Sequence, residues 1–316
     1  MKITVVGAGI SGLTAARICK DAGHDVTVFE TKGFIGGACA IDEDNNPRFG
    51  AHILHTNNRM VWEFIAKYCS IKKYDHYVIA RTDAGEVPVP FNYWSELLIG
   101  KKTDEELLNL IFRHYTMRQW GISYDDLPED TRKRVKVRRG GTDCRYFTDL
   151  YQGIPDYKQL FTNLRKDIDV LTGVAGGDWR NNDAELVFYS GCISDFSTDE
   201  CLQYRTCDFE ESKITTHCPV LNNCTSWTNE RWTRIHNFRS MGIGSKSMME
   251  TPRPCKYGEM RLYPLTVDEK QVNKYNQLMR DLPIHCIPIG RVAKYLYLDM
   301  DDAIYSTMIL VNSSIK

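Results

Sequence analysis

Hydrophobic and polar positions at the start of the chain follow the order of a β-α-β unit. The β-branched run from Lys2 to Val6 predicts a short strand, and the alternation from Asp25 to Glu30 predicts a second strand. Between them, Leu13 to Ala22 has the spacing of a helix. The glycine-rich stretch Gly7-Ala8-Gly9-Ile10-Ser11-Gly12 joins the first strand to this helix.

This turn is typical of dinucleotide binding rather than of a plain crossover. Gly7 permits the tight bend, Gly9 lets the backbone approach a pyrophosphate, and Gly12 lets the helix pack closely on the strand. The phosphates would then meet the N-terminus of a helix. Glu30, at the end of the second strand, can accept hydrogen bonds from a ribose diol, which disfavours a cofactor with a 2′-phosphate.

A second glycine pair, Gly36-Gly37, follows Glu30 closely. This pair resembles the signature of flavin enzymes related to glutathione reductase and the amine oxidases, in which FAD is held lengthwise. The resemblance favours FAD over NAD as the cofactor.

The remaining pattern predicts alternating helices and strands. Helices are expected over residues 60–69, 94–119 with an interruption at 100–102, 158–165 and 267–280, and after 289. Strands are expected over 74–81, 86–89, 167–171, 185–189 and 285–289, and residues 201–265 are strand-like and irregular. Because the strands at 167–171 and 185–189 are apolar, they are candidates to return to the first sheet.

Composition fits a globular protein that binds a small molecule. Of 316 residues, 42% are hydrophobic and 26% are charged, which suffices for two or three cores and excludes a disordered or fibrous chain. Forty Lys and Arg against 41 Asp and Glu give a net charge of −1, with no basic block. This balance offers no reason to expect a nucleic-acid or membrane partner.

Three further expectations concern compartment, thiols and metals. The chain enters a strand at once, without a cationic and apolar leader, so a cytoplasmic location is expected. The 11 cysteines contain no CxxC pair and are expected to be reduced. His52 and His55 have the spacing of a metal pair, but no third ligand is evident, and no metal is expected.

Three later segments can be compared with known families. They are FGAHILHTN at residues 49–57; YTMRQW at 115–120, followed by Lys133-Arg134, RYF at 145–147 and YQGIP at 151–155; and GRVAKYLYLDMD at 290–301. With the amino-terminal fingerprint, these segments resemble, in order, the GAHIFHTN-like, YTxKQW, RYF…YQGIP and GRLxxYxYxDMD stretches of bacterial UDP-galactopyranose mutases. Amine oxidases and glutathione reductases lack the last three of these stretches.

The resemblance implies an α/β fold with a discontinuous Rossmann-like FAD-binding domain. That domain would comprise residues 1–72, 155–200 and 281–316. A small inserted helical domain would cover 93–133, and an antiparallel β-sheet domain that binds substrate would cover 73–92, 134–154 and 201–280.

The implied activity is an isomerase that interconverts UDP-galactopyranose and UDP-galactofuranose. In this family reduced FAD acts through N5 as a nucleophile at the anomeric carbon, and no net redox change occurs. An external reductant such as NAD(P)H would keep the flavin reduced.

Catalytic roles carry over to Arg134, Arg234 and His52. Both arginines resemble the family's diphosphate-holding arginines, and Arg234 lies in Trp232-Thr233-Arg234-Ile235-His236, which resembles the family's YTRIxEH stretch. A guanidinium suits this role because its planar fork stays charged and donates two parallel hydrogen bonds. His52 would lie beside the flavin and the sugar, where an imidazole can donate a hydrogen bond.

Further residues resemble the family's binding positions. Tyr115 would stack on the uracil and Trp120 would lie beside the sugar, although spacing alone would also fit two core aromatics. The other implied substrate contacts are Tyr146, Tyr263, Tyr297, Asp299 and His76, the last standing where the family has an asparagine. The implied cofactor contacts are Gly7, Gly9, Gly12, Glu30, Gly36, Gly37, His52, Arg291 and Asp299.

The chain departs from the family pattern in two other places. The helical stretch between Asn92 and Trp120 is shorter than in typical bacterial members, and since that domain carries the family's dimer contact, the oligomeric state is left open. Asp208 stands where the family often has a second arginine.

Other functions remain open on the sequence. They are a mutase for UDP-N-acetylgalactosamine, a flavin oxidase or dehydrogenase of the same fold, and a nucleotide-sugar binding protein without catalysis.

Overall fold

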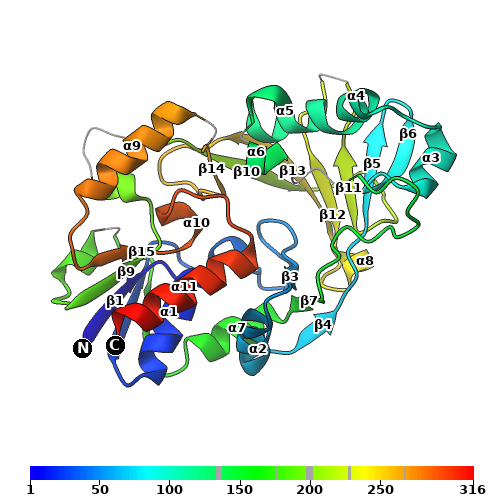
Figure 1. Ribbon diagram of the computed structural model, residues 1–316. Coiled ribbons are helices and arrows are strands. Elements are labelled where there is room, and N and C mark those ends of the chain that lie inside the picture. The colour runs from blue at the N-terminus through cyan, green and yellow to red at the C-terminus, as the bar shows by residue number, and fades with distance from the viewer. Residues whose placement is uncertain (128, 133–136, 176, 197–201, 227–228, 267) are drawn as a thin grey trace.

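The computed structural model describes residues 1–127, 129–132, 137–175, 177–196, 202–226, 229–266 and 268–316. A parallel sheet with its helices forms one half of the molecule, and a larger mixed sheet forms the other (Figure 1). A small three-stranded sheet lies between these halves, and both chain ends lie in the half that holds the parallel sheet (Figure 1).

The first sheet has five strands in the order β15-β9-β1-β2-β8, all parallel. The strands are β1 (Lys2–Val6), β2 (Asp25–Glu30), β8 (Asp169–Thr172), β9 (Leu186–Tyr189) and β15 (Cys286–Pro288). The prediction that the strands near 170 and 187 return to the first sheet is therefore confirmed. The apolar sequence of β9 suits its buried position inside the sheet, whereas β8 is an edge strand and is largely exposed.

Helices from distant parts of the chain pack around this sheet. The long helix α1 (Ile10–Asp21) contacts α11 (Met300–Ser314) and α7 (Tyr157–Leu164), and α2 (Arg59–Tyr68) contacts both α7 and α11. Gly12 permits the close approach of α1 to β1, because a Cβ there would lie 1.9 Å from the carbonyl oxygen of Gly7. Two other helices on this side are α9 (Glu269–Arg280) and the short α10 (Gly290–Ala293).

The second sheet has seven strands in the order β14-β10-β13-β12-β11-β5-β6. They are β5 (Val78–Thr82), β6 (Gly85–Val89), β10 (Tyr204–Glu211), β11 (Val220–Asn223), β12 (Arg234–Asn237), β13 (Ser247–Pro254) and β14 (Tyr263–Pro264). The expectation of an antiparallel sheet is wrong at one pair, because β11 runs parallel to β5. A short helix, α8 (Phe238–Met241), follows β12.

The helical insertion covers the sequence between β6 and β7. It contains α3 (Tyr93–Ile99), α4 (Asp104–Leu107), a π-helical turn (Leu108–Arg113), α5 (His114–Trp120) and α6 (Glu129–Arg132). The predicted interruption is confirmed: α3 ends at Gly100 with a φ of 79°, and Thr103 starts α4 with a capping box.

The small sheet has the order β3-β7-β4 and was not predicted. Its strands are β3 (Leu54–Thr56), β4 (Ile71–Lys73) and β7 (Tyr151–Pro155). The strand expected over 74–81 is thus wrong at its start, since β4 ends at Lys73 and β5 begins at Val78. This sheet connects the nucleotide-binding half to the seven-stranded sheet (Figure 1).

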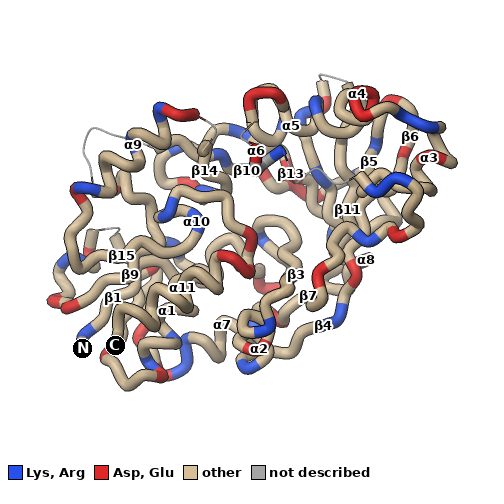
Figure 2. Tube along the Cα trace, in the orientation of Figure 1, with Lys and Arg blue, Asp and Glu red and all other residues tan. Residues whose placement is uncertain are grey.

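Charges of both signs are scattered along the trace in both halves (Figure 2). Ten cysteines are described, and all ten are free thiols. Among the described residues, no helix combines the length and the apolar character that crossing a membrane would need.

The free energy of unfolding should depend on the side chains buried around the parallel sheet. Leu13 of α1 is 0% exposed in the main core, whereas Leu97 of α3 is 67% exposed. We expect Leu13→Ala to lower the free energy of unfolding by about 2–5 kcal/mol and Leu97→Ala by less than about 0.5 kcal/mol. Urea unfolding of both variants measures this difference, and equal losses would contradict the described core.

Candidate functional site

A cavity of about 920 Å³ opens at the carboxyl ends of the parallel strands. Its wall includes the last residues of three strands, Val6 of β1, Glu30 of β2 and Tyr189 of β9. In an open parallel sheet this edge is where ligands bind. The N-terminal residues of α1 line one part of the cavity, and those of α11 line another.

Eight of the nine predicted cofactor residues line this cavity: Gly7, Gly9, Gly12, Glu30, Gly37, His52, Arg291 and Asp299. The ninth, Gly36, lies behind the wall, where its N–H donates to the carbonyl of Ala8 at 2.8 Å. A Cβ on Gly36, whose φ is 105°, would lie 2.8 Å from the Cα of Ala40. The second glycine pair therefore packs directly against the first glycine turn.

Backbone donors hold Glu30 at the cavity wall. Its Oε2 accepts from the N–H of Ala8 at 2.7 Å, and its Oε1 accepts from the N–H of Lys32 at 2.8 Å. Each carboxylate oxygen retains accepting capacity for a ligand hydroxyl. Nearby, α1 starts at Gly9 without a side-chain cap, so its first N–H groups suit an anion.

Arg291 stands at the other end of the cavity. Its Nη1 donates to the carbonyl of Leu262 at 3.1 Å, while its Nε and Nη2 donate to the carbonyl of Leu298. The guanidinium also lies over the ring of Tyr297, 4.8 Å from the ring centre, and 6.0 Å from that of Tyr263. Arg291 thus joins the cavity to the aromatic cluster described next.

His52 lies at this same end and is neutral at physiological pH. Burial, and then the charge of Arg291, lower its pKa to about 4. Its Nδ1 lies 3.1 Å from the carbonyl oxygen of Gly50, which can only accept, so Nδ1 carries the proton. The remaining nitrogen, Nε2, is therefore an acceptor, whereas the sequence suggested a donor.

Three predicted aromatic residues form one cluster. Trp120 meets Tyr297 edge to face at 5.3 Å and Tyr263 at 5.9 Å, and the two tyrosines stack at 6.0 Å. Arg205 holds the end of α5 in place, because its Nε donates to the carbonyl of Gln119 at 2.7 Å. Trp120 is therefore fixed against the seven-stranded sheet.

Arg234 points from β12 toward this cluster. Its Nη2 donates to the hydroxyl of Tyr263 at 2.9 Å, and its Nε donates to Oε2 of Glu250 at 2.6 Å. The other oxygen of Glu250 lies 2.8 Å from Nε2 of His236. Burial alone would raise the pKa of Glu250, but Arg234 and His236 hold it at about 2, so the carboxylate is charged.

Tyr146 and His76 lie against each other, with ring centres 5.9 Å apart. The N–H of Tyr146 donates to the carbonyl of His76 at 2.6 Å, and the His76 ring stacks on Phe147. Burial, followed by the charge of His236 and other neighbours, lowers the pKa of His76 to about 3. His76 is thus a neutral, packed side chain.

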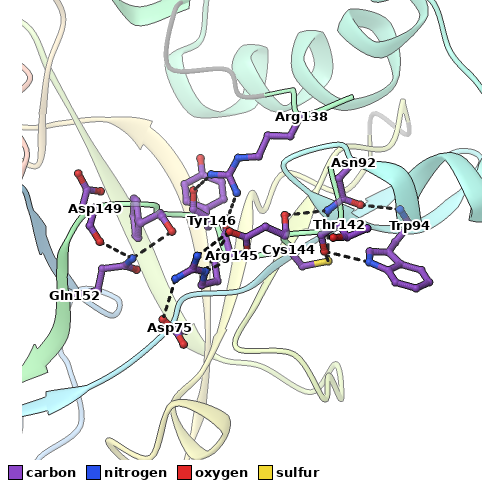
Figure 3. A network of polar contacts seen from close by, with 12 residues as sticks. Asp75, Asn92, Trp94, Arg138, Thr142, Cys144, Arg145, Tyr146, Asp149 and Gln152 are labelled. Carbon is purple, nitrogen blue, oxygen red and sulfur yellow. Dashed lines mark hydrogen bonds and ion pairs between the residues drawn. The ribbon is translucent and has the colours of Figure 1, made fainter. Parts of the chain in front are cut away.

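A polar network holds the segment that carries Tyr146 (Figure 3). Arg138 donates to the carbonyls of Arg145 and Tyr146 at 2.5 and 3.2 Å. Gln152 of β7 donates to the carbonyl of Asp149 at 3.0 Å. The segment is therefore tied down at both ends.

Tyr115, on α5, is half-buried beside the same charges. Burial raises its pKa, and the charges of Arg234 and Glu250 also act on its phenol. The hydroxyl stays protonated and can donate. Arg134 lies outside the described residues.

Sequence reasoning missed Glu250, Gly50 and Asn222. Glu250 could have been noticed as an acid that directly follows the apolar pair Met248-Met249 in a strand. Asn222 pairs with Arg234 across β11 and β12, hence on the same face, and its Oδ1 is buried without a partner among the described residues. No local signal in the sequence points to that pairing.

Asp208 does not lie free at the site. It forms an ion pair with Arg253 at 2.8 Å, and Arg253 also pairs with Glu259 of the loop that lines the cavity. In the described part of the chain, no group of three or more metal-binding side chains gathers.

Comparisons with known proteins bear on this site. Residues 110–297 match the family model for UDP-galactopyranose mutase, and residues 5–68 match the one for an NAD(P)-binding Rossmann-like domain. The chain is 30% identical to the dTDP-fucopyranose mutase of Escherichia coli, over 95% of this chain and 94% of that protein. It is 27% identical to a probable UDP-galactopyranose mutase of Klebsiella pneumoniae, over 95% and 91%.

Solved structures share the fold. A crystal structure of reduced UDP-galactopyranose mutase matches with a TM-score of 0.66 at 11% identity, covering 99% of this chain and 93% of that one. An oxidoreductase from Methanosarcina mazei matches with a TM-score of 0.57 at 14% identity, covering 99% and 100%. On the family model and the curated relatives, the chain belongs to the UDP-galactopyranose mutase family of isomerases.

Proposed function

We propose that this protein interconverts the pyranose and furanose forms of a nucleotide-linked sugar, with UDP-galactose as the first candidate substrate and FAD as cofactor. The observation that carries the proposal is that the cavity lies next to the cluster around Arg234. The cavity ends at His52, Arg291 and Asp299, and the cluster of Arg234, Tyr263 and aromatic rings begins there.

The cavity supports FAD as the cofactor. We assign the FAD-binding domain to residues 1–72, 155–200 and 281–316. Gly12 and Gly9 leave backbone room for a pyrophosphate at α1, and Glu30 offers acceptors to a ribose. When bound in reduced form, FAD supplies a nucleophilic nitrogen for the anomeric carbon of the sugar.

The residues at the far end support flavin and sugar binding. Asp299 lines the cavity just before α11, and its carboxylate can accept a hydrogen bond from a ligand N–H or hydroxyl. Nε2 of neutral His52 can accept a hydrogen bond from a sugar hydroxyl or from the cofactor. Because both groups are partly buried, water has limited access to this point.

Arg234 and nearby tyrosine hydroxyls could bind the diphosphate of the substrate. Arg234 keeps Nη1 without an acceptor among the described residues, so that edge can donate to phosphoryl oxygens as UDP leaves. Tyr263 accepts from Arg234, which leaves its own proton to donate. Tyr146 and Tyr297 would add donors, Tyr115 and Trp120 would contact the uracil and the sugar, and His76 would pack near the nucleotide.

A dTDP-linked 6-deoxy sugar is the second candidate substrate. The E. coli relative named dTDP-fucopyranose mutase is 30% identical, against 27% for the Klebsiella relative. Thymine differs from uracil by one methyl group, and fucose lacks the 6-hydroxyl of galactose, so the diphosphate contacts would be the same.

Product analysis tests the proposal and separates these substrates. The FAD-loaded protein is incubated with UDP-galactofuranose or dTDP-fucofuranose, with and without dithionite. We expect conversion to the pyranose only after reduction, and the larger kcat/KM identifies the substrate. UDP-N-acetylgalactosamine is the next substrate if neither reacts. Bleaching of oxidised flavin by a substrate would indicate an oxidoreductase, and binding without turnover would indicate a non-catalytic protein.

Cofactor retention should depend on Gly12. A Cβ there would lie 1.9 Å from the Gly7 carbonyl oxygen, whereas a Cβ on Gly33 meets nothing within 4 Å. We expect Gly12→Ala to lose most of its bound flavin and Gly33→Ala to keep it, measured as flavin absorbance per mole of folded protein. Full flavin content in Gly12→Ala would contradict the assigned phosphate site.

Turnover should depend on the two arginines assigned to the diphosphate. We expect Arg234→Ala and Arg134→Ala each to cost several kcal/mol of transition-state stabilisation, about 100-fold or more in kcat/KM. Arg59→Ala, at a side chain 77% exposed on α2, is the control and should leave kcat/KM unchanged. Unchanged kinetics in both test variants would refute their assignment.

A further inference from the structure

We infer that His236 is a positioning residue for Arg234, and that it acts through Glu250. The inference rests on the proposed function, because it takes Arg234 as the group that binds the leaving diphosphate. It concerns a side chain to which the family's YTRIxEH stretch gives no fixed identity, since His236 stands at the variable position x.

The carboxylate of Glu250 gives one oxygen to each partner. Oε2 accepts from Nε of Arg234 at 2.6 Å, and Oε1 lies 2.8 Å from Nε2 of His236. Since the carboxylate is charged and can only accept, Nε2 of His236 must donate. The side chains of Glu250 and His236 are only 2% and 5% exposed, so water does not compete for these bonds.

This division determines which N–H groups of Arg234 stay available. A free carboxylate pairs with a guanidinium through both oxygens and two parallel N–H groups. Because His236 occupies Oε1, Glu250 binds only Nε, and Nη2 turns to Tyr263. Without His236, Oε1 would be free to swing to Nη2, on the same edge of the guanidinium as Nε, and compete with Tyr263 for that donor. Tyr263 and the Nη1 edge of Arg234 would then no longer be held in place for the diphosphate.

Gly50 keeps this arrangement tight. A Cβ on Gly50 would lie 2.4 Å from Oε1 of Glu250 and 3.2 Å from Nε2 of His236, and its φ of +80° also favours glycine. The carbonyl of Gly50 accepts from His52, which lines the cavity. One backbone position therefore lies against the Glu250–His236 pair and also holds His52.

The ring of His236 is held by one hydrogen bond. Its Nδ1 is buried with no hydrogen-bond partner among the described residues. The bond between Nε2 and Glu250 is therefore the hydrogen bond that orients the ring.

The test compares two substitutions that differ in hydrogen bonding. His236→Leu removes the donor, and His236→Gln keeps an N–H donor on a side chain of similar reach. The dissociation constant of UDP is measured by calorimetry on the reduced, FAD-loaded protein, together with kcat and KM. We expect His236→Leu to weaken UDP binding and to lower kcat by about tenfold or more each, the size of a lost hydrogen bond to a charged group. His236→Gln should stay within a few-fold of the unchanged protein.

A double substitution separates positioning from general stability. If His236 acts through Glu250, then adding His236→Leu to Glu250→Gln should lower kcat no further than Glu250→Gln alone. Additive losses, or equal losses in His236→Leu and His236→Gln, would overturn the inference. If His236→Leu does not hold flavin, His236→Asn, which is too short to reach Glu250, replaces it with the same expected loss.

The proposed function fails in a different way. It fails if the unsubstituted, reduced protein converts neither furanose substrate. UDP binding still reports on His236 in that case, because it needs no turnover.

Discussion

The half of the molecule built on the seven-stranded sheet depends on the compensation of one buried charge, that of Glu250. Glu250 is almost completely removed from water, and a carboxylate in that position is tolerated only when fixed donors surround it. Arg234 and His236 supply those donors from the neighbouring strand β12. The same bonds orient Arg234, whose side chain stays 28% exposed and thus accessible to a ligand.

Two loops bring that charge next to the nucleotide-binding half. Residues around Gly50 and His52 lead into the small sheet, and residues from Lys294 to Asp299 link α11 to α10, which carries Arg291. Gly50 touches the Glu250–His236 pair, and Arg291 lies over the rings of Tyr263 and Tyr297. The cavity therefore lies next to the cluster of Arg234, Tyr263 and aromatic rings. The reason is that residues from the half with the parallel sheet pack directly on side chains of the seven-stranded sheet.

Local patterns predicted what depends on local physics. The spacing of Gly7, Gly9 and Gly12 predicted the turn at the cavity, and the Gly100 interruption predicted the break between α3 and α4. The parallel pairing of β5 with β11 and the small sheet were not predicted, because register between distant strands leaves no local signal. For the same reason Arg234 could be named from its motif, but its partner Glu250 could not. Arg134 lies outside the described residues and stays a prediction.

The central claim is that the cavity and the Arg234 cluster form one site for reduced cofactor and nucleotide sugar. A crystal structure of the reduced, FAD-loaded protein with UDP-galactose tests it most directly. The account predicts FAD along the cavity from α1 to α11, the diphosphate on Arg234 and Tyr263, and the anomeric carbon between the flavin and the diphosphate. A nucleotide bound elsewhere, or a sugar turned away from the flavin, would contradict it.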